Sequence, residues 1–274
     1  MRIAVPETSR EPASLEVAPV SSISRLVELM EGTHAKWRTA TLPDTNYDVW
    51  FRGVLDVAKH RLCASFHRFA CTADEDTVCA EFREAIAALN PEAALPEGWR
   101  TYASMQHHGV PTRLLDWTRA PLTALYFATE DPDLDGVDGG IIVMDPVQLN
   151  GQSGSRAIVD PTQGLREPYL PRALRSHPTP VDLPALPIAI HPPYSNKRLA
   201  AQRGCFTVSG TETYGVDAAF ASIPVDSRRY LRARIPADAK PIIRSSLRNL
   251  GINPETIYVD LPSAAARIKQ DFFK

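Results

Sequence analysis

Residues 105–129 read MQHHGVPTRLLDWTRAPLTALYFAT, the stretch in which the polar and aromatic side chains of the sequence are most concentrated. The residues before and after its central part show the spacing that is typical of helices. One helix is predicted at 99–108 with Gly109 as its stop, and another at 120–129 with Thr118 as cap and Pro121 in its first turn. Between and beside them stand side chains able to bind or react: Gln106, His107, His108, Thr112, Arg113, Asp116, Trp117 and Thr118. Loops that carry such residues on a rigid scaffold are where functional sites usually lie, so this segment is the first candidate site.

A purely structural role for the same segment stays open. Arg113 would then pair with Asp116, and the two histidines would cap the preceding helix. A metal site is not indicated, because adjacent His107 and His108 on a helix point about 100° apart and no His-Glu-x-x-His pattern follows.

Nucleophilic catalysis has little support in the sequence. No Gly-x-Ser-x-Gly elbow is present, and Ser153 lies in a linker-like GQSGS segment. Cys205 could act with His107, His108 or His191, but a lone cysteine in a strand pattern is usually a core residue.

The elements around this segment predict an α+β fold. Strands are expected where apolar residues alternate or run together, at 46–53, 139–145, 205–209, 230–235 and 257–260. Helices are expected from near Ser22 to a stop at Gly32, and at 74–90, 196–202, 241–250 and from 263 onward. No Gly-x-Gly-x-x-Gly turn or regular βαβ cadence is present, which favours mixed or antiparallel sheets with peripheral helices over a Rossmann fold.

The first predicted strand carries the pattern WFRG at residues 50–53. Val49 and Phe51 are expected on one face and Trp50 and Arg52 on the other, with Arg52 at the end of the strand.

The domain organisation predicted from composition is one domain with decorations. Residues 1–21 lack periodicity and are expected to be a flexible tail, and residues 22–274 are expected to be a single domain. The proline-rich segment at about 150–193 is expected to be a long loop or insertion.

Charge and cysteine content narrow the classes of protein. The net charge of −2 and the pI near 6.4 argue against strong general nucleic-acid binding. No apolar run approaches the roughly 18 to 20 residues that a membrane span needs, so a cytoplasmic protein without a membrane partner is expected. Four cysteines without Cys-x-x-Cys spacing are expected to be reduced and unpaired.

Three segments together resemble the FRG domain family. They are WFRG at 50–53, the run at 105–129, and RLAAQRGCFTVSG at 198–210. The resemblance covers roughly residues 22–210 and continues more weakly through TIYVDLPSAAARIK near the end of the chain.

The order of these segments is also similar to that of the NAD-dependent ADP-ribosyltransferases of the R-S-E class. The resemblance implies an ADP-ribosyltransferase-like core, a glycosyltransferase activity that uses NAD, and transfer of ADP-ribose to an unknown macromolecule or small molecule. Arg52 would hold the phosphates or ribose of NAD and Thr118 would steady the nicotinamide ribose, while His107, His108 and Arg113 would complete the cofactor site.

The chain departs from the R-S-E pattern at its last position. Gln202 stands in place of an acid and brings no negative charge, so it is expected to bind a ribose hydroxyl and to be assisted by a carboxylate. Asp116 and Glu212 are the nearest candidates, and Gln202 with Asp116 is the predicted catalytic pair. The alternative is a non-catalytic module that binds protein or nucleotide, because fold and function are separable.

Overall fold

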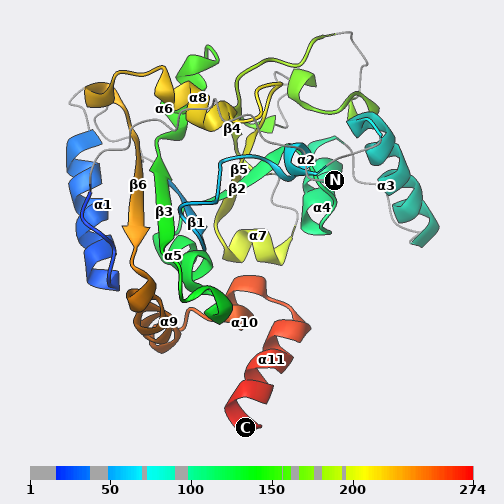
Figure 1. Cartoon of the computed structure of the whole chain (residues 1–274). Helices are drawn as coiled ribbons and strands as arrows, with labels where there is room; N and C mark the ends of the chain where they lie inside the picture. Colours follow the sequence, from blue (N-terminus) through cyan, green and yellow to red (C-terminus); the bar gives the residue numbers. More distant parts are fainter. Residues whose placement is uncertain are drawn as a thin grey trace.

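The fold is built on one six-stranded sheet whose paired strands are all antiparallel. The computed structural model describes residues 17–37, 49–69, 73–89, 98–155, 157–161, 167–175, 181–192 and 196–273. Within these ranges the strands are β1 (Trp50–Val54), β2 (Leu114–Thr118), β3 (Gly139–Met144), β4 (Ile188–Ile190), β5 (Gly204–Val208) and β6 (Tyr230–Ile235). Their order in the sheet is β4-β5-β2-β1-β3-β6, and helices surround it (Figure 1). The α+β class with an antiparallel sheet and peripheral helices is therefore confirmed.

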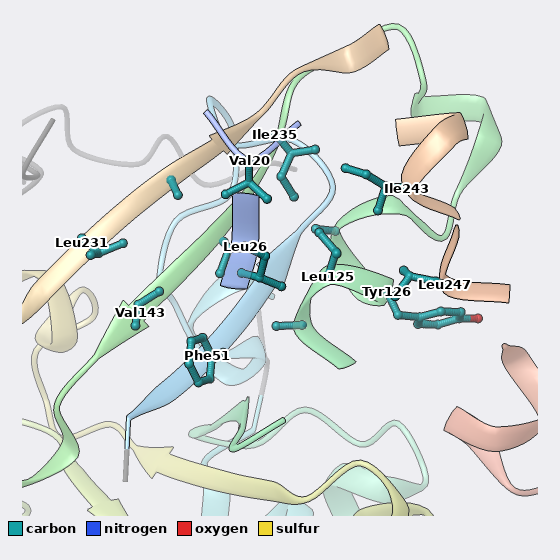
Figure 2. Packing of buried hydrophobic residues seen from close by; sticks show 14 of the residues in the cluster. Val20, Leu26, Phe51, Leu125, Tyr126, Val143, Leu231, Ile235, Ile243 and Leu247 are labelled. Carbon is teal, nitrogen blue, oxygen red and sulfur yellow. The ribbon is translucent and has the colours of Figure 1, made fainter. Parts of the chain in front are cut away.

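One face of β1, β3 and β6 is covered by α1 (Ile23–Trp37), α5 (Pro121–Thr129) and α9 (Lys240–Asn249). Phe51 of β1, Val143 of β3 and Leu231 of β6 alternate with residues of the other face and point into this core, as the period of a strand requires. Figure 2 shows them meeting Leu26 of α1 and Leu125 of α5, with Ile243 and Leu247 of α9 beside them.

The opposite face is covered by α6 (Pro146–Gln152) and α8 (Gly215–Ala221). Trp50 of β1 lies in this second core, so the expected separation of Trp50 from Val49 and Phe51 is confirmed.

A third core lies at the β4 end of the sheet. It packs α3 (Glu75–Leu89) and α4 (Trp99–His107) against β2, β4 and β5. The short α2 (Ser65–Arg68) lies between β1 and α3 in the chain, and the helices α7 (Lys197–Ala201), α10 (Pro254–Tyr258) and α11 (Leu261–Phe272) complete the fold.

Several local predictions differ from the structure. The first helix does not stop at Gly32 but continues to Trp37, since burial of Thr33 and Trp37 outweighs a glycine cost of about 1 kcal/mol. Arg52 lies in the middle of β1 and not at its end. Residues 257–260 are not a strand, because Asn253 and Thr256 form a capping box that starts α10.

The proline-rich segment at about 150–193 was expected to be a long loop or insertion, and its described part carries some regular structure. Its described part contains the end of α6 and the edge strand β4, which pairs with β5. Proline is compatible with edge strands, and Pro187 directly precedes β4. The strand β2 and the helix α8 were not predicted either.

The beginning of the chain is ordered earlier than expected. Residues 1–16 lie outside the described ranges, but Val20 is fully buried and its N–H donates to the carbonyl of Arg234 at 2.8 Å. The boundaries of the expected tail and single domain stay predictions.

Gly53 permits the closest approach between a helix and the sheet. A Cβ atom at this position would lie 1.9 Å from the carbonyl oxygen of Ala124 and 2.8 Å from the amide nitrogen of Ala128, both in the backbone of α5. Only glycine therefore allows α5 to rest directly on β1.

We predict that Gly53→Ala lowers the free energy of unfolding by about 3 kcal/mol or more, because the rigid backbone of α5 must move away from β1. Chemical denaturation measures this loss. Gly32→Ala is the matched control: nothing lies within 4 Å of its added Cβ, and removing a helical glycine raises stability by about 0.5–1 kcal/mol. Equal unfolding midpoints for the two variants would contradict the described contact.

Candidate functional site

The candidate site opens where two halves of the sheet meet. β1 pairs with β3 through five residue pairs, but with β2 through the single pair Phe51 and Thr118. Beyond that pair the Nη1 atom of Arg52 donates to the carbonyl of Asp116 at 2.5 Å, so a side chain stands where a backbone ladder would continue.

A cavity of about 310 Å³ lies beside this junction, at the lower end of the range for small-molecule sites. Its walls come from β1, β2, α4, α5, α7 and the residues that follow them. Polar and charged side chains in the wall are Arg52, His60, Gln106, His107, Asp116, Thr118, Glu130, Asn196, Arg198 and Gln202. The structure thus brings together Arg52, Asp116, Thr118 and Gln202, which are far apart in the sequence.

Arg52 is the most constrained cation of the cavity. Its Nε atom is shielded from solvent and has no hydrogen-bond partner among the described residues. Burial lowers the pKa of Arg52, nearby Asp116 raises it, and the positive charge of Arg68 lowers it. The guanidinium still stays charged in the physiological range, so an unused donor on this partly buried cation suits an anionic ligand.

Asp116 is an exposed carboxylate held by a short chain of hydrogen bonds. Its Oδ2 atom accepts from Nε2 of Gln106 at 2.9 Å, and Oε1 of Gln106 accepts from the hydroxyl of Thr112 at 2.6 Å. The structural alternative of an ion pair between Arg113 and Asp116 is not what the structure shows, since Arg113 pairs with Glu75 at 2.7 Å.

Thr118 and Gln202 are bound to each other and to neighbouring segments. The Thr118 hydroxyl donates to the backbone carbonyl of Gln202 at 2.6 Å and accepts from the N–H of Ala120 at 2.9 Å. The Nε2 atom of Gln202 donates to the carbonyl of Ile257 in α10 at 3.2 Å. Both side chains therefore also fasten the wall of the cavity.

Glu130 and Arg198 are among the wall residues that the sequence did not predict. Glu130 directly follows α5, and its Oε2 atom accepts from the hydroxyl of Tyr258 in α10 at 2.6 Å. The guanidinium of Arg198 lies over the ring of Tyr258, 4.7 Å from its centroid. Glu130 directly follows the run 105–129 and belongs to no spacing pattern in the sequence, so only its contact with α10 identifies it.

The remaining predicted residues lie in different places. His107 lines the cavity, and burial, His108 and Arg198 each lower its pKa. His108 is exposed and is not among the wall residues, and Glu212 is likewise exposed and outside the wall. Arg113 is buried away from the cavity and donates to the carbonyls of Ser209 and Tyr169 at 2.7 and 2.6 Å.

The cysteine alternative does not reach the cavity. Cys205 is buried in the core that contains Trp117, and it is not among the wall residues. Cys63 and Cys79 are buried free thiols, as expected, and burial raises the pKa of Cys79 to about 12. Cys71 lies outside the described residues.

Searches for other kinds of site gave no candidate in the described part of the chain. There, no group of three His, Cys, Asp or Glu side chains is placed to hold a metal ion. No helix in the same ranges combines the length and the apolar character that crossing a bilayer requires.

Comparison with known proteins gave one match. A model of the FRG domain family matches residues 47–136, which include Arg52, Asp116, Thr118 and Glu130 and end before Gln202. Neither the curated proteins nor the solved structures contain a match.

We predict that Arg113→Ala destabilises the fold by about 3–5 kcal/mol, because it leaves Glu75 and two carbonyls without their buried partner. Thermal and chemical unfolding measure the loss. Arg100→Ala, at an exposed position of α4, should stay within about 0.5 kcal/mol of the parent. An Arg113→Ala protein as stable as the Arg100→Ala protein would contradict this role.

Proposed function

Because the chain carries an FRG domain, we propose that the cavity beside Arg52 binds NAD and presents it as a donor of ADP-ribose to an acceptor. The main support for this proposal is that Arg52, Thr118 and Gln202 line the same cavity. These are the three positions that resemble the R-S-E transferases.

Charge at the cavity supports a phosphate-bearing ligand. Arg52 offers an unused buried Nε donor, and Arg198 adds a second cation to the wall, whereas the lowered pKa of His107 favours its neutral form. A guanidinium binds a phosphate through two parallel hydrogen bonds, which a point charge cannot do. A volume of about 310 Å³ suits one half of a dinucleotide, with the other half at the open rim.

A non-catalytic module that binds a nucleotide or a protein is the second candidate. It is favoured by the bond from Gln202 to Ile257, which gives that side chain a structural task. The two candidates differ in whether bound NAD is consumed.

We predict that Arg52→Lys weakens NAD binding by about tenfold, since lysine keeps the charge but loses the two-pronged donor. Isothermal titration of the pure protein with NAD measures this change. Arg68→Lys is the matched control, because Arg68 is an exposed neighbour outside the wall and should leave affinity unchanged. A parent protein that does not bind NAD at millimolar concentration would rule out the proposal.

We predict that Gln202→Ala weakens NAD binding by about 0.5–1.5 kcal/mol if its amide meets the ribose, the net range for one neutral hydrogen bond. The variant also loses the contact with Ile257, so its unfolding must be measured alongside. Lower stability with parental affinity per folded molecule would assign Gln202 to the scaffold alone. Mass spectrometry of a lysate incubated with the protein and NAD then tests for added ADP-ribose.

A further inference from the structure

Glu130 and Gln202, which are far apart in the sequence, both hydrogen-bond to the short helix α10. Glu130 accepts a hydrogen bond from the Tyr258 hydroxyl at 2.6 Å, and Gln202 donates to the carbonyl of Ile257 at 3.2 Å. Ile257 and Tyr258 are consecutive in α10, so this helix holds both a carboxylate and the neutral amide that stands in place of an acid. Both side chains also line the cavity.

The surroundings of Glu130 fix its orientation. Tyr258 of α10 and Tyr126 of α5 both hydrogen-bond to its carboxyl group, and Arg198 of α7 faces the same group. Asp131 is the acidic neighbour. Burial raises the pKa of Glu130, while the two tyrosines and Arg198 lower it in part. A carboxylate that is partly removed from water and held by two donors acts on nearby charge more strongly than an exposed one.

Asp116 is the other carboxylate of the wall, and its setting differs. It is exposed, its side chain is held by Gln106, and its backbone carbonyl holds Arg52. These contacts suit a residue that positions Arg52.

We propose that Glu130 is the catalytic carboxylate of the cavity, acting on NAD bound beside Arg52 and Gln202. The inference rests on the proposed function. The bond between ribose carbon C1 and the nicotinamide nitrogen breaks, and its electron pair leaves with nicotinamide. Glu130 stabilises the positive charge that develops on the ribose. The oxygen of water or of an acceptor hydroxyl then bonds to C1, and its proton passes to Glu130 and on to solvent. The products are nicotinamide, ADP-ribose or its adduct, and one proton.

The test compares NAD binding with nicotinamide release for the parent and Glu130→Gln. The amide keeps the size of the side chain but removes its charge, so we expect binding within about threefold of the parent and release at least about 100-fold slower. Glu212→Gln, outside the wall, is the matched control and should behave like the parent. Parental release by Glu130→Gln, or a parent that binds NAD and releases no nicotinamide, would overturn the inference. Absence of NAD binding by the parent is a different result, because it refutes the proposed function itself.

Stability and pH separate a catalytic role from a structural one. The folded-state pKa of Glu130 is raised above its ordinary value, so its stabilising contribution exists at low pH and is lost as the pH rises through that raised pKa. Glu130→Gln should therefore melt no lower than the parent at neutral pH. Tyr258→Phe removes a donor that lowers the pKa of Glu130, so the acid limb of the rate profile should move to higher pH. A large loss of stability in Glu130→Gln with release unchanged per folded molecule would show a purely structural role.

Discussion

The contact between Gly53 and the backbone of α5 is the constraint on which the site depends. Since a Cβ atom at position 53 would collide with the carbonyl of Ala124, the absence of a side chain sets how closely α5 can lie on β1. The roles of the two residues that precede Gly53 follow from this contact. Phe51 points into the core under α5, while Arg52 points to the other face and towards the cavity. The three residues Phe51, Arg52 and Gly53 thus supply a core anchor, a charge and a close approach.

The cavity follows from incomplete pairing in the middle of the sheet. A fully paired β1 and β2 would use their backbone groups on each other and leave no room for a side chain. Pairing through one residue pair instead leaves the Asp116 carbonyl to accept from Arg52. Placing a charged residue inside a sheet is costly unless it is hydrogen-bonded, and this bond partly offsets that cost. The Nε donor of Arg52 remains without a hydrogen-bond partner among the described residues, and Arg52 lines the cavity.

Much of the fold could be predicted because local patterns agreed with tertiary packing. The helix at 75–89 begins at the cap formed by Asp74, and the strands at 139–144 and 230–235 are mostly buried, as their apolar sequences predict. The errors arose where distant contacts decide the outcome. LLDWT became the strand β2 because β5 pairs along its whole length, and Arg113 left the site because Glu75, 38 positions earlier, supplies its ion pair. Glu130 was missed for the same reason, since its partner Tyr258 lies 128 positions away.

The helix α10 connects the last segment of the chain to the wall of the cavity. It touches the wall through Ile257 and Tyr258 and ends at Val259, whose φ of 54° and ψ of 43° place a β-branched residue in the left-handed region. Such a residue costs about 1–3 kcal/mol and persists only where its surroundings hold it. On the side before Val259, α10 is held by the hydrogen bonds to Gln202 and Glu130 and by the packing of Arg198 on Tyr258. On the side after it, Asp260 caps α11. Tyr258, which donates to Glu130, thus directly precedes the position that carries this backbone strain.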